Sequence, residues 1–179
     1  VTAGSDITVE NGFFGTIVPE GVDLPTSPED RANLSGGNLN IDAGGGDVSM
    51  TGHVDLVSTI ASLDITGRSV TLGNSNQDDI DLSPLTQMNV NTSQNLTMQN
   101  ADVVPMNSEL LDYSLNIGNE FSMTDSDLET DLGAFNVATG GNFTMSNSEF
   151  LDGGFDAGEV GLTPATELDI GGDWIMDNF

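Results

Sequence analysis

Two clusters of acidic residues have side chains that could hold a metal ion. Each cluster places several carboxylates within a few residues, and hard oxygen ligands of this kind are what calcium prefers. The candidate ligands are Asp78, Asp79, Asp81, Asp125, Asp127 and Asp131. Neither cluster has the spacing of an EF-hand loop or of the glycine-rich calcium nonapeptide. Calcium is therefore the one cofactor that the sequence suggests, and a solvated acidic surface is the alternative interpretation.

A second series of polar residues recurs along the chain, each between two apolar residues. It consists of Asn40, Asp64, Asn89, Asn116, Asn136 and Asp169. This alternation is typical of a strand with one buried face, so we expect the series to point outward. A glycosidase needs two carboxyls within about 5–10 Å, whereas Asp64 and Asp169 would lie about 19 Å apart if each repeat adds about 4.8 Å. The series therefore favours a ladder of hydrogen-bonded side chains over a catalytic site, and we expect no enzyme activity.

The charge of the chain is strongly one-sided. Its 179 residues include 29 Asp and Glu but only 2 Lys and Arg, which gives a formal net charge of −27. With Arg31 and Arg68 as the only strong bases and His53 as the only imidazole, the chain cannot form a cationic surface. This excludes binding to nucleic acid, which needs Lys and Arg against phosphates, and to anionic membranes. No apolar stretch approaches the roughly 18 residues of a membrane span, and the lack of cysteine excludes disulfides.

One sequence unit recurs six times. It consists of an apolar–Asx–apolar triplet, a short polar turn, and a second triplet that usually has Ser or Thr in its centre. The first triplets begin at residues 39, 63, 88, 115, 135 and 168. The second triplets end on five of the seven methionines: Met50, Met98, Met123, Met145 and Met176. Both triplets have a period of two, so each unit supplies two strands, and we expect the methionines to fill the core.

A third signal follows the second triplet in three of the units. Residues 98–103, 123–128 and 145–150 share the order Met, polar, Asx, Ala or Ser, acid, apolar. Asx at this position suits a left-handed corner, beyond which a third short strand begins. Three strands per unit and insertions of variable length between units predict an all-β chain, a parallel β-helix (β-solenoid) of about six to seven coils. We expect it to occupy residues 33–179, after an N-terminal strand-containing segment over residues 1–32.

Both ends of the expected solenoid carry apolar residues suited to association. Open strand edges recruit other chains, and a segment can add to such an edge as an extra strand. We therefore expect head-to-tail assembly, a contact that grows filaments when it does not close a ring. The candidate residues are Ile7, Val9, Phe13, Phe14, Ile17, Val18, Trp174, Met176 and Phe179. The alternative is that residues 1–32 cap the first coil of their own chain and that the sequence is a piece of a longer protein.

Several coils resemble those of known right-handed parallel β-helices. The likeness rests on residues 143–150 (FTMSNSEF) and on residues 37–41 followed by 46–50, and it covers about residues 34–179. The sequence is similar to exported bacterial adhesins of the filamentous-haemagglutinin and autotransporter type, and more distantly to the pectate-lyase superfamily. The resemblance implies right-handed winding and export. It implies no single function, because these groups include adhesins, fibre proteins and polysaccharide enzymes.

The leading functional hypothesis is a non-enzymatic structural protein that assembles with copies of itself into extracellular filaments or a surface layer. The chain begins at Val1 without Met, so we expect an extracellular or cell-surface location after signal-peptide removal. Cell-surface or matrix components are further expected partners. Because stacked copies of this charge repel one another, salt or divalent cations should promote assembly. The alternatives are an adhesin passenger domain that binds a host or neighbouring surface and, third, a calcium-dependent polysaccharide-active enzyme.

Overall fold

The computed structural model of the chain is built from short strands. It describes residues 1–10, 13–14, 38–56, 62–74, 78–82, 87–103, 112–130, 134–152 and 166–177. These residues form strands and turns but no helix. Accordingly, this part of the chain contains no helix long and apolar enough to cross a membrane.

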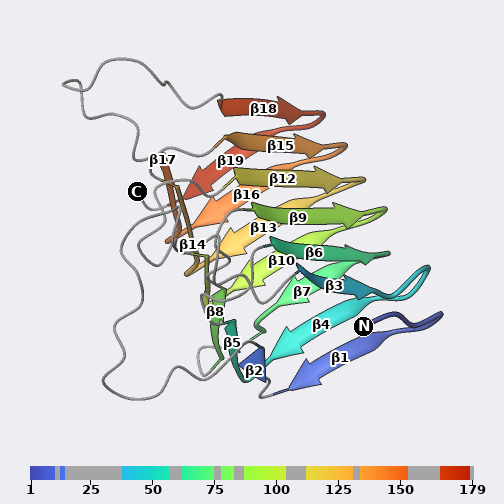
Figure 1. The fold of residues 1–179 in the computed structure, drawn as a ribbon. Coiled ribbons are helices and arrows are strands. Elements are labelled where there is room, and N and C mark those ends of the chain that lie inside the picture. Colours follow the sequence, from blue (N-terminus) through green and yellow to red (C-terminus); the bar gives the residue numbers. More distant parts are fainter. Residues whose placement is uncertain are drawn as a thin grey trace, which may run out of the picture.

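The strands form three parallel sheets, which we name A, B and C (Figure 1). Sheet A consists of β3 (Asn38–Asp42), β6 (Ser62–Gly67), β9 (Gln87–Thr92), β12 (Asp112–Ile117), β15 (Phe135–Thr139) and β18 (Thr166–Ile170). Sheet B consists of β1 (Ile7–Glu10), β4 (Val48–Thr51), β7 (Val70–Leu72), β10 (Leu96–Gln99), β13 (Phe121–Thr124), β16 (Phe143–Ser146) and β19 (Trp174–Asp177). Sheet C consists of β2 (Phe13–Phe14), β5 (His53–Leu56), β8 (Asp79–Leu82), β11 (Ala101–Val103), β14 (Asp127–Thr130) and β17 (Glu149–Asp152).

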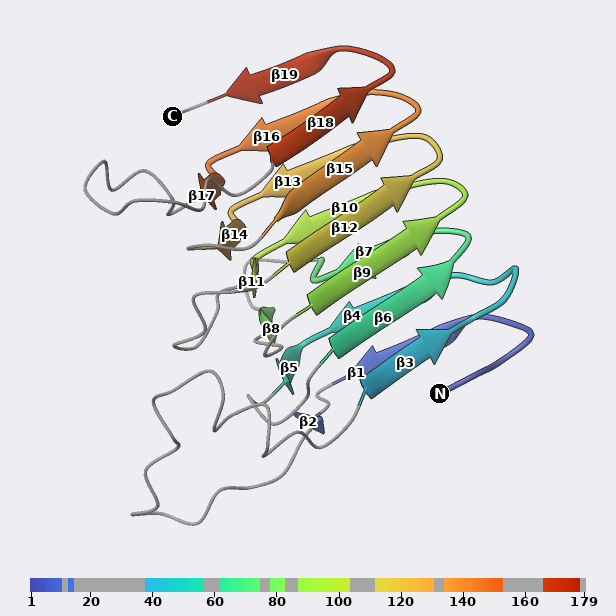
Figure 2. The same ribbon diagram turned by 45° about the horizontal axis from the view of Figure 1, so that its top comes forward.

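The chain visits sheets B, C and A in turn, so every third strand is a neighbour in the same sheet. The strands stack along one axis from β1 to β19, and the chain winds around that axis as a right-handed solenoid (Figure 1, Figure 2). This is the hand that connections between parallel strands take in nearly all proteins. Among the described residues, sheet B has seven strands and sheets A and C have six each. The predicted fold class, an all-β parallel solenoid with three short strands per coil, is confirmed.

Side chains alternate along each strand between the core and an outer face. In β13, Phe121 and Met123 are buried, whereas Ser122 and Thr124 are partly exposed, as a period of two requires. The methionines predicted for the core are buried in four coils: Met50, Met98, Met123 and Met145. The fifth, Met176, is 40% exposed because β19 is the last described strand of its sheet.

Aromatic rings stack along the axis between neighbouring coils. The ring centroids of Phe121 and Phe143 lie 4.6 Å apart with an interplanar angle of 10°, and Phe143 stacks in turn on Trp174 at 5.9 Å. On sheet A, Tyr113 stacks on Phe135 at 4.6 Å. These spacings are near the strand separation of about 4.8 Å, so successive coils fill the same inward position with a ring.

The buried hydroxyl of Tyr113 connects sheet A to sheet C. It lies within hydrogen-bond distance of the carbonyl oxygens of Val103 in sheet C at 2.9 Å and Glu129, also in sheet C, at 2.7 Å. Burial raises the pKa of this hydroxyl above its usual range, so it stays protonated and donates. The ring at the same time packs on Phe135 of the next strand of sheet A.

A row of left-handed residues turns the chain from sheet B to sheet C in five coils. The φ angles are 75° at Gly52, 69° at Gly73, 50° at Asn100, 49° at Asp125 and 49° at Asn147. Asn and Asp adopt this region more readily than other residues with a Cβ. The three predicted Asx corners are therefore confirmed, and glycine fills the same position in two earlier coils.

Candidate functional site

The predicted outward Asx series lies on sheet A, but in two adjacent rows. Strand register defines row 1 as Asn40, Asp64, Asn89, Ser114, Asn136 and Glu167. Row 2 is Asp42, Thr66, Asn91, Asn116, Ala138 and Asp169. The prediction of one row is therefore wrong at Asn116 and Asp169. A shift of two residues keeps every side chain on its face, so the apolar alternation could not detect it.

Rows 1 and 2 are the walls of a polar trough along the solenoid axis. Two adjoining hollows of about 330 and 260 Å³ lie on this face, and Ser114 and Asn116 of β12 line both of them. Buried residues between the rows, such as Val90 and Leu115, line the floor. The trough runs from β6 to β18, about 19 Å at about 4.8 Å per strand. Figure 2 shows sheet A facing the reader, with no described segment drawn across it.

Few side chains of the trough hydrogen-bond to other described residues. Nδ2 of Asn89 donates to Oδ1 of Asp64 at 2.6 Å. The remaining polar wall residues of the middle coils are exposed and hydrogen-bond through their side chains to none of the described residues: Asn91, Ser114, Asn116 and Asn136. The expected ladder of bonded amides therefore forms at one step only in the described part of the chain.

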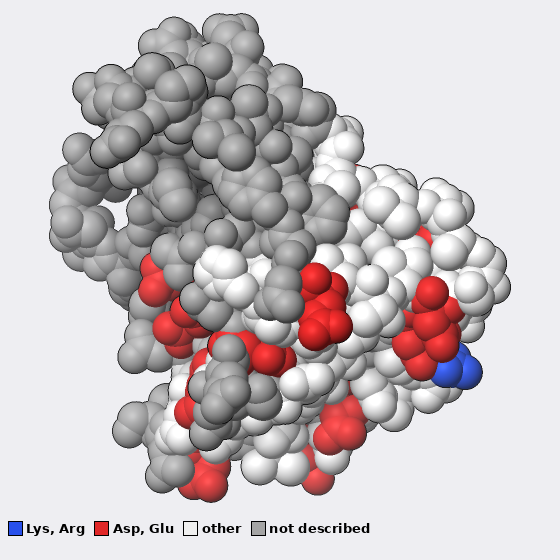
Figure 3. Space-filling view, turned by 90° about the horizontal axis from the view of Figure 1, so that it is seen from below, with Lys and Arg blue, Asp and Glu red and all other residues white. Residues whose placement is uncertain are grey.

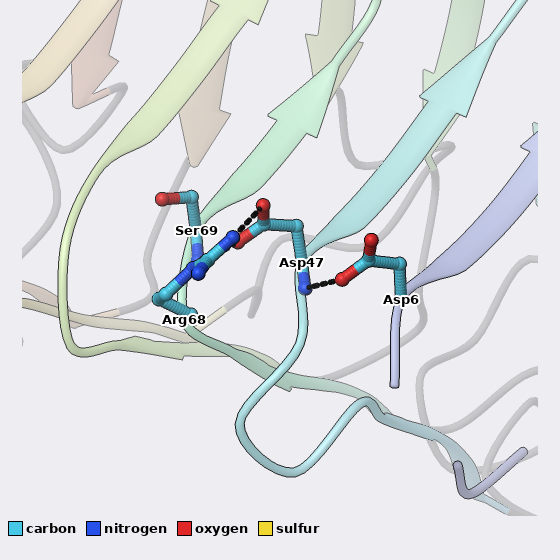
Figure 4. Close-up of polar contacts among 4 residues, drawn as sticks. All are labelled: Asp6, Asp47, Arg68 and Ser69. Atoms are coloured by element: carbon cyan, nitrogen blue, oxygen red, sulfur yellow. Dashed lines mark hydrogen bonds and ion pairs between the residues drawn. The ribbon is translucent and has the colours of Figure 1, made fainter. Parts of the chain in front are cut away.

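A different row of side chains does form hydrogen bonds from one coil to the next. It lies in the turns that precede the strands of sheet B (Figure 4). Oδ1 of Asp6 accepts the backbone N–H of Asp47 at 2.9 Å, and Oδ1 of Asp47 accepts that of Ser69 at 3.1 Å. Asn95 and Asn142 accept in the same way from the next coil, at 3.3 and 2.9 Å. We call these acceptors the turn row: Asp6, Asp47, Asn95 and Asn142. The sequence prediction missed it, although an Asx directly before the strand was a visible signal.

The ion pair of Asp47 with Arg68 lies in the turn row. Nε and Nη2 of Arg68 donate to the two carboxylate oxygens at 2.9 and 2.5 Å, with side chains 55% and 38% exposed for Arg68 and Asp47. The guanidinium lowers the pKa of the Asp47 carboxyl. Arg68 is the only Lys or Arg among the described residues, and Figure 3 shows basic atoms at one place beside acidic atoms, with further acidic patches elsewhere.

Acidic residues of sheet C stand in one row. By register the row is Asp55, Asp81, Asp102, Asp127 and Glu149. Acidic residues at matching positions of neighbouring strands are unfavourable, and these strands lie about 4.8 Å apart. Two predicted calcium ligands, Asp81 and Asp127, belong to this row, with β11 between them.

The other predicted calcium ligands lie apart from this row or cannot be placed. Oδ2 of Asp78 accepts the backbone N–H of Asn74 at 2.6 Å, Asp79 begins β8, and Asp125 occupies a left-handed corner. Asp131 is outside the described residues. Within the described part of the chain, no three His, Cys, Asp or Glu side chains form a group that could hold a metal ion. Calcium stays a prediction.

The two ends of sheet B contain most of the predicted assembly residues that the structure places. β1 pairs with β4 and β19 with β16, and the opposite edges of β1 and β19 pair with no described strand. Ile7 is buried and Val9 packs partly buried against the core. Trp174 is 50% exposed and Met176 40%, although their register positions are buried in the preceding coils.

The remaining assembly residues are in β2 or cannot be placed. Phe13 and Phe14 form β2, which pairs with β5 of the same chain. Ile17, Val18 and Phe179 lie outside the described residues. The first residues of the chain also join the fold, because Ala3 donates its N–H to the Asp42 carbonyl at 2.8 Å.

Comparisons of the chain with descriptions of protein families, with curated proteins and with solved structures find no match.

Proposed function

We propose that this chain is a non-enzymatic structural protein that works outside the cell and assembles head to tail into filaments or a surface layer. The observation that carries the proposal is the edge of β19 that pairs with no described strand, where Trp174, Ile175 and Met176 are 50%, 45% and 40% exposed. Exposed apolar residues on an unpaired strand edge recruit further strands. The resemblance of the repeat sequence to exported bacterial adhesins of the filamentous-haemagglutinin and autotransporter type supports the extracellular setting.

The register of sheet B supports β1 of a second copy as the partner of this edge. Continuing the register of the seven strands places Ile7 of the second copy on Trp174 and Val9 on Met176. Both pairs extend columns that are apolar in every described coil. The contact would cover exposed apolar surface with side chains that already face a core, which is favourable at about 25 cal/mol per Å².

Sheet A supports the same geometry. Residues 1–3 run beside the end of β3, with a parallel bridge between Thr2 and Asp42. When β1 of one copy stacks on β19 of another, the register of row 2 brings Thr2 opposite Asp169 at the end of β18. Two sheets would therefore continue across the junction.

The same register predicts where the junction is weak. Glu10 of the second copy falls opposite Asp177, and Asp6 falls opposite Asp173, each pair carrying two exposed carboxylates. Like charges on neighbouring strands oppose pairing, and salt screens exposed charges. Assembly should therefore depend on ionic strength or on divalent cations such as calcium.

The positions of the acids on sheet A support a non-enzymatic role. Asp64 and Asp169 lie on β6 and β18, four strands apart, or about 19 Å, beyond the reach of a glycosidase pair. Glu167 and Asp169 share the face of β18, yet both are exposed to water. The acid of a glycosidase pair is held against apolar groups.

Sedimentation velocity over a range of protein concentrations in about 1 M salt, where the Debye length is only about 3 Å, tests the proposal. We expect the wild type to form larger species as concentration rises, and Trp174→Asp to stay a monomer. Thr97→Asp introduces the same charge on an outward position in the middle of sheet B, and it should assemble like the wild type. A wild type that stays monomeric at every concentration, or equal assembly of Trp174→Asp, would overturn the proposal.

A further inference from the structure

The trough on sheet A is built from hydrogen-bonding groups that the described part of the chain leaves unsatisfied. The side chains of Asn91, Ser114, Asn116 and Asn136 are exposed and bond to none of the described residues. Each amide can donate two hydrogen bonds and accept two. We infer that this trough is a binding site for an extended, uncharged saccharide chain lying along the solenoid axis.

Free amides are not a general property of Asn in this solenoid. In the turn row, Asn95 accepts hydrogen bonds from the side chain of Asn119 and the backbone of Glu120, and Asn142 accepts from Asp173. Those amides link neighbouring coils of the fold, whose strands have the same spacing as the strands of sheet A. The amides of the trough belong to its two walls and line the hollows, which leaves them available to a ligand with many hydroxyl groups.

The charge distribution selects the class of ligand. The middle of the trough, from Asn89 to Asn136, has no charged wall residue. Carboxylates stand at both ends, with Asp64 on β6 and Glu167 and Asp169 on β18. A polyanionic chain would meet these acids and a protein of charge −27, so uronic-acid and sulfated polymers are disfavoured. A basic peptide would find carboxylates only at the ends.

The backbone of the trough also disfavours a peptide. β9, β12 and β15 are each paired on both sides, so their N–H and C=O groups are already used and no strand can be added there. A ligand must bind through the side chains of the walls. Each strand offers one residue on each wall, about 6.6 Å apart at about 3.3 Å per residue.

The repeat of the walls suits a chain of sugar rings. Wall pairs recur about every 4.8 Å, close to the length of one pyranose unit in an extended polysaccharide. The five strands from β6 to β18 would therefore hold about four units. The trough lies on a side face of the solenoid, so this inference does not rest on head-to-tail assembly.

The test is a titration of the full chain followed by NMR of the Asn side-chain amides. The probes are a neutral β-1,4-linked glucose hexamer, an N-acetylglucosamine hexamer, a galacturonate hexamer and a lysine hexapeptide. We expect the neutral hexamers to shift the amides of Asn91, Asn116 and Asn136 and to leave those of Asn95 and Asn142 unchanged. Calorimetry should show about fivefold weaker binding for Asn116→Ala, as for the loss of one hydrogen bond.

Thr144→Ala is the matched control, because Thr144 is an outward residue of sheet B away from the trough, and it should bind like the wild type. If Asn116→Ala fails to fold, the amide shifts of the wild type still decide the matter. The inference is overturned if neither neutral hexamer shifts the trough amides. It is also overturned if the galacturonate hexamer or the lysine peptide binds as tightly as the neutral sugars.

Discussion

Asp47 is the residue of the turn row that forms an ion pair with a cation, Arg68. Its two carboxylate oxygens accept hydrogen bonds from Arg68, and one of them also accepts the backbone N–H of Ser69. The Arg68 guanidinium is the main cause that holds the pKa of the Asp47 carboxyl below its usual value, and partial desolvation opposes it. A carboxyl with a lowered pKa in the folded state binds fewer protons there than in the unfolded chain.

We predict that Asp47→Asn lowers the melting temperature near neutral pH and that this difference shrinks on acidification. The contribution of the ion pair is fully present above the ordinary carboxyl pKa of about 3.9 and is lost as the pH falls through the lowered pKa. Thermal unfolding of both proteins at a series of pH values measures it. Asp173→Asn removes an exposed carboxylate that forms no ion pair with the described residues, so it is the matched control for the loss of one charge. A pH-independent gap for Asp47→Asn would contradict the assignment.

Asn147 shows how one backbone angle fixes a corner. Its φ of 49° is unfavourable for a residue with a Cβ and free for glycine. We predict that Asn147→Ala lowers the free energy of unfolding by about 1 kcal/mol more than Asn147→Gly. Both variants lose the hydrogen bond from Nδ2 to Asp125, so urea unfolding of the pair isolates the effect of the angle. Equal losses would show that the side-chain bond, not φ, matters here.

At the scale of elements, the aromatic stack of sheet B holds neighbouring coils together. Phe143 is fully buried between Phe121 and Trp174. We predict that Phe143→Ala lowers the free energy of unfolding by about 3–5 kcal/mol, and that Phe143→Leu loses less because it leaves a smaller cavity. The adjacent outward variant Thr144→Ala should change it by about 0.5 kcal/mol or less. Denaturant unfolding measures all three, and equal effects of the two alanine variants would contradict this packing.

The strands and corners follow from local sequence, whereas the register between strands does not. The alternation in Phe121–Thr124 and the Asx at Asn100 specify a strand and a corner by themselves. Asn116 was assigned to the wrong row because its strand, β12, is shifted by two residues against the repeat, and such a shift leaves the alternation intact. The sequence did not reveal the turn row, because its side chains hydrogen-bond to the backbone of another coil. It did not reveal the trough, because the trough forms only between two rows whose positions depend on the register of the strands.

At the scale of the whole molecule, charge opposes the association that the terminal edges favour. The junction proposed above sets Asp177 against Glu10 of the next copy. We predict that Asp177→Lys assembles at lower salt than the wild type, because it turns a repulsive pair into an attractive one. Glu120→Lys makes the same change of charge in an exposed turn in the middle of the solenoid. Light scattering during a salt titration measures the midpoint of assembly for each protein.

The two lysine variants separate a local contact from net charge. If repulsion at the junction is responsible, Asp177→Lys shifts the midpoint more than Glu120→Lys does. If only the total charge of −27 matters, the two shifts are equal. Adding calcium at matched ionic strength then shows whether a divalent cation promotes assembly by more than the screening of charge.

Cryo-electron microscopy of the protein at high concentration and high salt tests the central claim most directly. The seven described strands of sheet B in each copy predict filaments in which each copy adds about 34 Å along the axis, with strands continuing at about 4.8 Å across the junction. Separate particles, or filaments whose copies join through side faces instead of β1 and β19, would contradict it.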